Sequence, residues 1–298
     1  MSGGRRKSID STRVWTQVDV VSRAALGSGA LDPITTTGVR VGDGGIDFVV
    51  REVSSLFRKF DAQANTSPAR NPFLPYEEAL YLGDPTPSHV ALLNKFPVMA
   101  RHLLVVSRAF VHQETLLLPE DFIALTRCMG SSECLAFYNA GREAGASQRH
   151  RHLQLVPLPL EGADPLTPID PTLALVKGRV GADIANVGYR HALGWFHDDP
   201  GMSCETRGLE MHAMYRQLLE VLGIAGMRSP EGDRQSHPYN LLATRSWMLL
   251  IPRTREHFET ISVNALGFAG SLFVRNETEG ALVRRVGPRA VLAAVTQR

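Results

Sequence analysis

The stretch GASQRHRHLQLVPLPL, residues 145–160, decides how this chain folds and what chemistry it carries. His150, His152 and Gln154 stand at every second position. In an extended strand, alternate side chains share one face about 7 Å apart, so these three side chains are predicted to lie together. The leucines that alternate with them then point to the opposite face, toward a core. Imidazole and amide groups gathered on one strand face favour a ligand-binding or catalytic site over a merely solvated sheet surface.

Length and charge set the class of protein. A chain of 298 residues is long enough for one elaborated domain or two closely joined halves. Lys+Arg 32 against Asp+Glu 30 gives a formal net charge of +2, too small for a global field that attracts nucleic acid or membranes. We therefore expect a local anion site, with no nucleic-acid or membrane partner. The oligomeric state is open.

Cysteine usage and the N-terminus indicate a cytoplasmic location. Cys128, Cys134 and Cys204 form no CxxC pair and leave an odd count, so neither a disulfide framework nor a zinc knuckle is expected. The first ten residues are basic, but no apolar run follows them, and no run is long enough to span a bilayer. We interpret residues 1–10 as a frayed tail.

Periodicity and turn residues predict an α+β chain. Two β-rich runs around a glycine and aspartate turn predict a hairpin over residues 39–50. Residues 61–75, rich in polar residues and proline, predict a surface loop. The other expected elements are strands at 91–96, 102–106 and 134–141, helices beginning at 119 and spanning 204–223, a hairpin turning at 244–246, and a closing helix at 288–298.

A proline-rich stretch, VPLPLEGADPLTPIDP at residues 156–171, is the clearest linker. It divides the chain into an N-terminal part, 1–165, which carries HxHxQ, and a C-terminal part, 173–298. We expect the two parts to pack as one structural unit.

Several ordered stretches carry a family resemblance. They are LLNKFPV (92–98), HLLVVSRAF (102–110), LAFYNAGREAGASQRHRHLQLVPLP (135–159) and SVNALGFAG (262–270). Together they resemble the ATP adenylyltransferases, also called diadenosine tetraphosphate phosphorylases, of the histidine triad superfamily, related to galactose-1-phosphate uridylyltransferase. The similarity spans roughly residues 43–275. The resemblance implies an α+β histidine triad fold: an antiparallel sheet with helices packed on it, and a nucleotide over the strand that carries the motif.

The resemblance also implies an activity, the reversible phosphorolysis of diadenosine tetraphosphate to ATP and ADP. It makes His152 the nucleophile, which carries AMP as adenylyl-histidine; an imidazole with an unperturbed pKa of about 6.5 is mostly neutral and nucleophilic at neutral pH. Gln154 would bridge phosphate oxygens without contributing a proton. The implied ligands are diadenosine tetraphosphate, ATP, ADP, AMP and phosphate. No cofactor is required and no metal is expected in the histidine site, although a divalent cation such as Mg²⁺ can accompany the polyphosphate.

Further substrate contacts follow from the resemblance. Ser147 and Gln148, on a turn with Gly145 and Ala146, would cradle the α-phosphate through backbone N–H groups. Asn139 would hold ribose or phosphate. The remaining implied contacts are Asn94 and Lys95 near the polyphosphate, Lys59 as a loose match to a phosphate-binding lysine, and Ser262, Val263, Asn264, Ser271 and Arg275 from the C-terminal part.

Some positions depart from the family pattern. Arg149 stands where relatives commonly carry proline, and we expect it to point to solvent. Ser271 and Arg275 stand where methionine and lysine are frequent, and Arg275 keeps the charge with a wider donor fork. These departures bear on substrate preference more than on the type of reaction.

Other histidines are assigned simpler roles. His150 is expected to orient or pack beside the nucleophile, and His89, His102 and His112 are expected to be structural or exposed. Trp247 and Met248 are assigned to the core of the second hairpin.

Three alternatives remain open. A metal site on the two motif histidines is weak, because such sites generally need a nearby carboxylate and a third histidine. A sensor that binds dinucleotides without turnover has no need for an intact HxHxQ. The nearest enzymatic competitor is a hexose-1-phosphate nucleotidyltransferase, against which SVNALGFAG favours the adenylyl branch.

Overall fold

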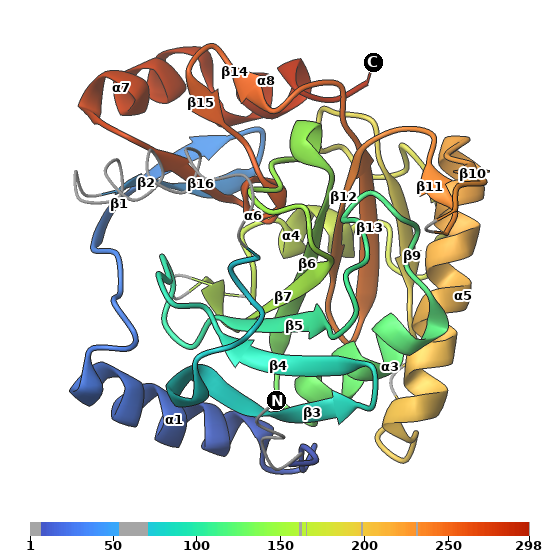
Figure 1. The fold of residues 1–298 in the computed structure, drawn as a ribbon. Coiled ribbons are helices and arrows are strands. Elements are labelled where there is room, and N and C mark those ends of the chain that lie inside the picture. The colour runs from blue at the N-terminus through green and yellow to red at the C-terminus, as the bar shows by residue number, and fades with distance from the viewer. Residues whose placement is uncertain are drawn as a thin grey trace.

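A nine-stranded antiparallel sheet is the centre of the molecule (Figure 1). The computed structural model describes residues 7–53, 71–160, 163–164, 166–197, 199–230 and 232–297. The strand order is β3-β4-β5-β7-β6-β12-β13-β9-β8. These strands are β3 (Tyr81–Thr86), β4 (His89–Leu93), β5 (Leu103–Ser107), β6 (Cys134–Ala140), β7 (His152–Pro157), β8 (Gly181–Ala182), β9 (Ala192–Trp195), β12 (Tyr239–Ala243) and β13 (Trp247–Pro252). The predicted α+β class is confirmed.

A smaller sheet of three strands lies beside the large one. It contains β1 (Thr36–Asp43), β2 (Ile46–Val53) and β16 (Ser271–Val274), with β1 antiparallel and β16 parallel to β2. Gly44 and Gly45 connect β1 to β2 with φ of 61° and 84°, the positive values that a two-residue type I′ turn requires. The predicted hairpin over 39–50 is confirmed. The C-terminal helices near this sheet are α6 (Ala265–Phe268), α7 (Glu277–Val286) and α8 (Pro288–Ala294).

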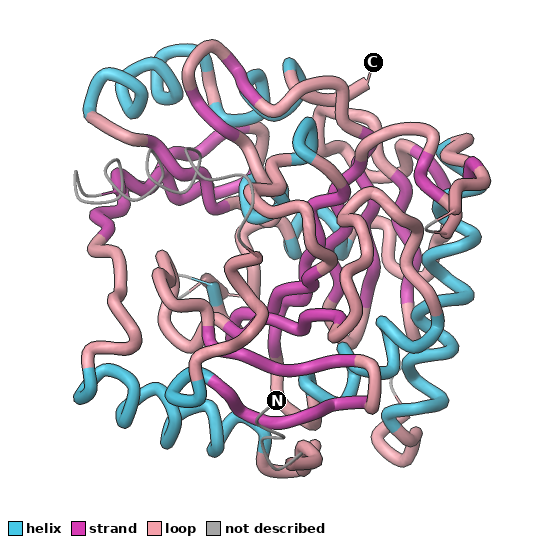
Figure 2. Tube along the Cα trace, viewed as in Figure 1, coloured by secondary structure: helices cyan, strands magenta, loops and turns pink. Residues whose placement is uncertain are grey.

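Three longer helices cover one face of the large sheet (Figure 2). They are α1 (Val14–Ser28), α3 (Pro119–Met129) and α5 (Cys204–Leu222). Leu153 and Leu155 of β7 are buried in the same core cluster as Phe122 of α3 and Tyr215 of α5. The leucines of the motif therefore point to a core, as their alternation predicts.

The opposite face of the sheet carries His152 and Gln154, and we call it the front face. On one side of the motif, Val106 and its neighbours on β4 and β5 form an apolar cluster with Phe73. On the other side, Phe137 belongs to a larger cluster that includes α6 and the small sheet. The motif side chains thus lie between two apolar clusters.

Most other predicted elements are confirmed. The helices begin at 119 and 204, Gly223 ends α5 in the left-handed conformation, and β12 and β13 form the second hairpin with Trp247 and Met248 buried. The closing helix is shorter than predicted, and of the predicted loop at 61–75 only residues 71–75 lie within the described residues. The short elements are η1 (Glu78–Leu80), η2 (Arg142–Ala144), α4 (Asp170–Ala174), β10 (Gly226–Met227), β11 (Arg234–Gln235), β14 (His257–Phe258) and β15 (Ile261–Ser262).

The N-terminal segment differs from the prediction. Residues 1–6 lie outside the described residues, but the next ones are not a frayed tail. Asp84 N donates to Lys7 O at 2.6 Å, and Ile9 N donates to Asp84 O at 3.2 Å. This segment adds backbone hydrogen bonds to the exposed edge of β3 before α1 begins. Its Ile9 side chain is buried in the core, so the segment is ordered.

The β6–β12 ladder joins the two predicted parts of the chain. Residues 239–243 of β12 pair with residues 136–140 of β6, so the N-terminal and C-terminal parts contribute to one continuous sheet. The boundaries at 165 and 173 stay a prediction.

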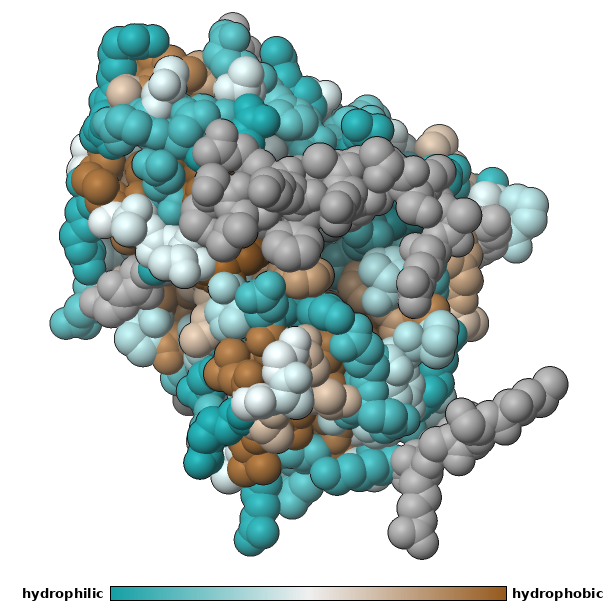
Figure 3. All heavy atoms as spheres, turned by 60° about the vertical axis from the view of Figure 1, so that its left-hand side comes forward, coloured by the Kyte–Doolittle hydropathy of each residue, from teal (hydrophilic) through white to brown (hydrophobic). Residues whose placement is uncertain are grey.

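The outer surface fits the balanced composition. The face shown in Figure 3 mixes hydrophilic residues with scattered apolar patches. Within the described ranges, no helix has the length and apolar character needed to cross a bilayer.

Gly208 is required where α5 packs on α3. A Cβ at this position would lie 2.7 Å from Ile123 Cα and 2.8 Å from Ile123 N, too close for a backbone that two helices hold in place. We expect Gly208→Ala to lower the free energy of unfolding by about 1–3 kcal/mol, as overpacking does. Gly27→Ala in α1 is the matched control, because no atom lies within 4 Å, and it should stabilise by about 0.5–1 kcal/mol. Urea denaturation of both variants measures the difference, and a stabilised Gly208→Ala would contradict this close packing.

Candidate active site

The first residue of β7, His152, has its imidazole fixed by the strand itself. Its Nδ1 lies 2.8 Å from the carbonyl oxygen of His150. Because a carbonyl oxygen only accepts, Nδ1 carries the proton and Nε2 keeps a lone pair. Burial lowers the pKa of His152 to about 4, so the ring is neutral at neutral pH. The geometry presents one unprotonated ring nitrogen on the front face.

The Gln154 amide is oriented by a chain of hydrogen bonds. His102 Nε2 lies 2.9 Å from Gln154 Oε1, and Asn94 Nδ2 lies 3.2 Å from His102 Nδ1. The amide oxygen only accepts, so the His102 proton is on Nε2 and Asn94 donates to Nδ1. Burial lowers the pKa of His102 to about 4, which keeps this ring neutral as well. The Gln154 amide nitrogen is therefore left to donate to a ligand.

His102 is a site residue that the sequence reasoning missed. The sequence predicts a structural or exposed role for it, whereas the structure places it against the motif glutamine. Its contact with Gln154 depends on the pairing of β5 with β7, which no local sequence pattern shows. The same contact gives the predicted Asn94 an orienting role through its side-chain nitrogen, while its Oδ1 accepts from Phe96 N.

Asn139 lies on the neighbouring strand β6, and its side-chain oxygen is fully engaged. Asn139 Oδ1 accepts from Asn240 Nδ2 at 2.8 Å and from the Ala265 backbone N at 2.9 Å. Both contacts use Oδ1, so Nδ2 is the group available to donate to a ligand. The C-terminal part of the chain thereby orients an N-terminal site residue.

The turn before the motif touches the SVN segment. A Cβ at Gly145, where φ is 86°, would lie 2.7 Å from Val263 O and 3.0 Å from Asn264 Cα. Glycine is needed here both for the positive φ and for this close approach. Asn264 caps α6 by accepting from Leu266 N at 3.0 Å. The structure thus brings Gly145, Val263 and Asn264 together.

Other members of the turn are less enclosed. Ala146 N donates to Gly141 O at 3.1 Å. Ser147 is exposed, Gln148 is half-buried, and Arg149 is exposed, as expected for a side chain that points to solvent.

The predicted cationic contacts are paired within the protein. Lys95 Nζ lies 2.5 Å from Glu77 Oε1, and Arg275 Nη2 lies 2.6 Å from Glu279 Oε1. These partners neutralise the local positive charge that the sequence predicts for a polyphosphate.

Two serines and one lysine are the remaining predicted substrate contacts. Ser262 Oγ donates to Glu256 Oε1 at 2.7 Å. Ser271 is fully buried in β16, and its hydroxyl has no partner among the described residues. Lys59 lies outside the described residues. No hydrogen bond between described residues links Lys95, Ser262, Ser271 or Arg275 to the motif strand.

Both ring nitrogens of His150 are hydrogen-bonded within the protein. Its Nε2 lies 2.7 Å from Ser107 O, and its Nδ1 lies 2.7 Å from Asn71 Nδ2. Both nitrogens are therefore used, so His150 cannot ligate a metal in this arrangement. Among the described residues, no group of three or more His, Cys, Asp or Glu is arranged to hold a metal ion.

The aromatic ring of Phe73 packs against the imidazole of His152. The Phe73 ring centroid lies 4.9 Å from that of His152, and His152 is 4% exposed. Phe73 belongs to no helix or strand, so its side chain can rotate without breaking a ladder hydrogen bond.

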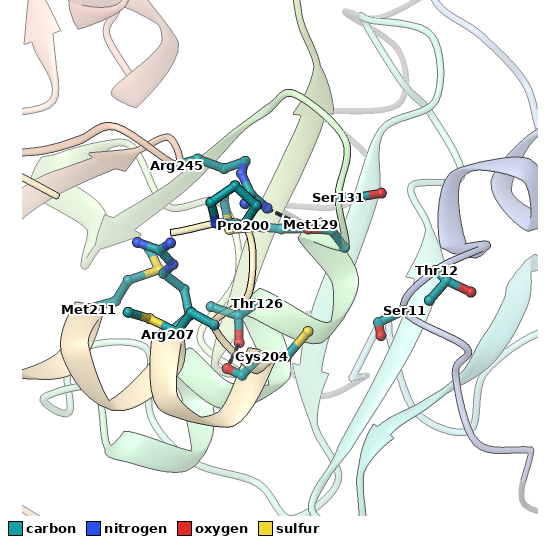
Figure 4. Close-up of a pocket in the computed structure, with 12 residues that line it drawn as sticks. Ser11, Thr12, Thr126, Met129, Ser131, Pro200, Cys204, Arg207, Met211 and Arg245 are labelled. Carbon is teal, nitrogen blue, oxygen red and sulfur yellow. Dashed lines mark hydrogen bonds between the residues drawn. The ribbon is translucent and has the colours of Figure 1, made fainter. Parts of the chain in front are cut away.

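A separate cavity of about 180 Å³ lies away from the motif (Figure 4). It forms where the end of α3 meets the beginning of α5, and Arg245 at its edge donates to Gly130 O at 2.9 Å. Its lining is Ser11, Thr12, Thr126, Met129, Gly130, Ser131, Pro200, Met202, Cys204, Arg207, Met211 and Arg245, which includes no motif residue.

A strand-borne neutral imidazole, with its proton held by the backbone and an oriented amide beside it, is an arrangement that can act as a nucleophile in group transfer. Residues 5–175 match the family model for the Ap4A phosphorylase N-terminal domain, and residues 185–298 match the model for the ATP adenylyltransferase C-terminal domain. The chain belongs to the Ap4A phosphorylase and ATP adenylyltransferase family.

Individual relatives agree with this assignment. Protein APA1 of Saccharomyces cerevisiae is 25% identical over 283 residues, which cover 86% of this chain and 84% of the relative. Diadenosine 5',5'''-P1,P4-tetraphosphate phosphorylase 2 of the same yeast is 26% identical over 280 residues, covering 82% and 78%. The crystal structure of yeast Ap4A phosphorylase Apa2 is similar in fold, with a TM-score of 0.75, 21% identity and coverage of 97% of this chain and 95% of that one.

The two neutral histidines predict a pH dependence of stability. His102 and His152 have a pKa of about 4 in the folded protein, against about 6.5 in an unfolded chain. Between these values the unfolded chain binds more protons, so the free energy of unfolding falls as the pH falls from about 6.5 to about 4. Each group contributes a slope of up to about 1.4 kcal/mol per pH unit. Denaturation at several pH values tests this prediction. If NMR shows the His102 or His152 imidazole titrating near pH 6.5 in the folded state, the prediction is contradicted.

Proposed function

We propose that this chain phosphorolyses diadenosine tetraphosphate to ATP and ADP through an adenylyl group carried on His152 Nε2. The observation that carries the proposal is the hydrogen bond from His152 Nδ1 to His150 O, which leaves Nε2 as the only ring nitrogen able to attack. Membership in the family and the substrate named for the yeast relative support the choice of dinucleotide.

The reaction takes two displacements at one phosphorus. In the first, the Nε2 lone pair forms a bond to the α-phosphorus, the bond to the bridging oxygen breaks, and ATP leaves as an anion. In the second, a phosphate oxygen attacks the same phosphorus, the P–N bond breaks, and ADP is released with the imidazole neutral again. The sum is diadenosine tetraphosphate plus phosphate to ATP plus ADP, and no proton has to be supplied to a poor leaving group.

The backbone carbonyl of His150 stabilises the intermediate. While Nε2 carries AMP, Nδ1 keeps its proton, so the ring becomes a cation buried on the front face. A hydrogen bond from a charged donor to a carbonyl oxygen is stronger than one from the neutral ring. The contact that sets the tautomer in the free enzyme therefore also favours the adenylylated state.

Amide groups on both sides of His152 take the charge on the phosphoryl oxygens. Gln154 directs its side-chain nitrogen outward because His102 holds its oxygen. Asn139 does the same because Asn240 and Ala265 hold its oxygen. Such donors need no reorientation when charge develops, which is the condition for electrostatic stabilisation of a transition state.

The adenylate reaches Nε2 by taking the place of the Phe73 ring. A divalent cation such as Mg²⁺ accompanies the polyphosphate, and no resident cofactor takes part. Lys95, Lys59, Ser262, Ser271 and Arg275 stay candidate substrate contacts in this proposal, with Lys95 and Arg275 exchanging a carboxylate for phosphate. We also propose a cytoplasmic location, since the three cysteines are unpaired.

Product analysis tests the proposed reaction directly. We expect ATP and ADP to form from diadenosine tetraphosphate only when phosphate is present, because water is not the second attacking group. Chromatographic separation of the nucleotides, with and without phosphate, measures this. ATP plus AMP formed without phosphate would indicate a hydrolase, and binding without products would indicate a sensor.

Replacement of the nucleophile tests the covalent step. We expect His152→Ala to lose at least about 10³-fold in kcat while AMP affinity changes little, because the variant has no group to carry AMP. His191→Ala is the matched control: His191 is also buried, and its Nδ1 lies 2.9 Å from Tyr189 O, two residues earlier. Its kcat should stay within about threefold. Turnover by His152→Ala at the wild-type rate would contradict the assignment.

A further inference from the structure

The ladder between β6 and β7 stops just before the two residues that matter most for the reaction. The strands pair from Cys134 opposite Pro157 to Phe137 opposite Gln154. Continued by two more residue pairs in the same register, Asn139 would face His152. At that point a side chain, Gln113, stands between the two backbones.

The Gln113 amide replaces the missing strand contacts. Its Oε1 accepts from His152 N at 2.9 Å. Its Nε2 donates to Asn139 O at 2.9 Å and to His152 O at 3.3 Å. A side-chain amide offers the same donor and acceptor as a peptide group, so Gln113 extends the ladder across a gap that the backbones cannot bridge.

Gln113 is itself firmly placed. It is 1% exposed, and its backbone N donates to Arg149 O at 2.7 Å. Its carbonyl oxygen accepts from the Tyr138 hydroxyl, which reaches it from the core side of β6. Strands β6 and β7 and the turn before β7 are thereby tied to one residue that lies in no strand of the sheet.

We propose that Gln113 is a positioning residue for adenylyl transfer, which sets the His152 backbone relative to Asn139. The proposal rests on the proposed function. The direction of Nε2 follows from the backbone at 152 together with the Nδ1 contact to His150 O, so a shift of that backbone moves the attacking nitrogen. Without Gln113, both buried backbone groups of His152 would also lack a partner on this side. A displacement of the attacking atom by about 1 Å costs about 10²-fold in rate.

A second buried glutamine provides a matched control. Gln235 is 7% exposed, and its Nε2 donates to Ala140 O at 2.6 Å, one residue beyond Asn139 on the same strand. No hydrogen bond links it to His152. Replacing Gln235 removes a comparable buried contact to β6 without touching the nucleophile.

The experiment compares Gln113→Met with Gln235→Met in the full-length chain. Methionine is unbranched and close in volume, so it keeps the packing while it removes the amide. For Gln113→Met we expect kcat and the single-turnover rate of adenylylation to fall about 10²-fold, with the Kd for AMP within about threefold of wild type. For Gln235→Met we expect kcat within about threefold at a similar loss in thermal stability. Equal kcat losses in the two variants, or an unchanged kcat in Gln113→Met, would overturn the proposal.

Two further measurements keep the result decisive. Gln113→Glu is the second variant, to be used if Gln113→Met does not fold. It retains an acceptor for His152 N but has no N–H for the two carbonyl oxygens, so we expect a similar loss in kcat. NMR of the His152 Nδ1 proton reports the ring position without turnover. If wild-type protein does not turn over diadenosine tetraphosphate, the proposed function fails. In that case an unchanged His152 signal in the Gln113 variants overturns the positioning role, and a shifted signal supports it.

Discussion

The main constraint on this structure is that polar groups buried in the middle of the front face must find hydrogen-bond partners within the protein. The motif lies between two apolar clusters, where an unpaired donor or acceptor costs about 1–3 kcal/mol. The partners that satisfy these groups also set their chemistry. The carbonyl of His150 fixes the tautomer of His152, and His102 fixes the direction of the Gln154 amide. The same hydrogen bonds therefore satisfy the buried polar groups and orient the side chains of the site.

The C-terminal part of the chain helps to hold the site together through a buried arginine. Arg253 is 1% exposed, and burial lowers its pKa to about 9, so it stays charged at neutral pH. It forms no ion pair with another described residue; instead it donates to Val263 O at 2.9 Å, to Val295 O at 3.1 Å and to Asn240 Oδ1 at 2.5 Å. Asn240 in turn holds Asn139. The Arg253 guanidinium therefore joins the SVN segment, the end of α8 and β12. Through Asn240 of β12 it also reaches Asn139 of β6, the strand that pairs with β7.

Local signals in the sequence were sufficient for most elements and for the centre of the site. Alternation places His152 and Gln154 on one face of β7, and proline or glycine marks the ends of α3 and α5. Helix α1 is not predicted because its first turn has no capping side chain and no acidic residue, so the sequence carries no local start signal there. The tail before it was misread because its order depends on hydrogen bonds to β3, which no local pattern records.

The roles of His102 and Gln113 could not be read locally for the same reason. Each acts on a motif residue about 40 or 50 positions away, across a strand pairing that only the fold creates. The ion pairs of the predicted phosphate contacts differ in how far the sequence shows them. Lys95 is a local charge in the sequence, but its partner Glu77 comes from another segment. Arg275 and Glu279 are four residues apart, so that ion pair was visible in the sequence.

The joining of β6 to β12, and of Asn139 to the first residue of α6, has a consequence for biosynthesis. A nascent chain that has left the ribosome as far as the proline-rich linker already contains His152. It still lacks the strand beside β6 and the backbone donor that orients the asparagine. Asn139 therefore reaches the orientation described above only after β12 and α6 have been synthesised and have packed beside β6.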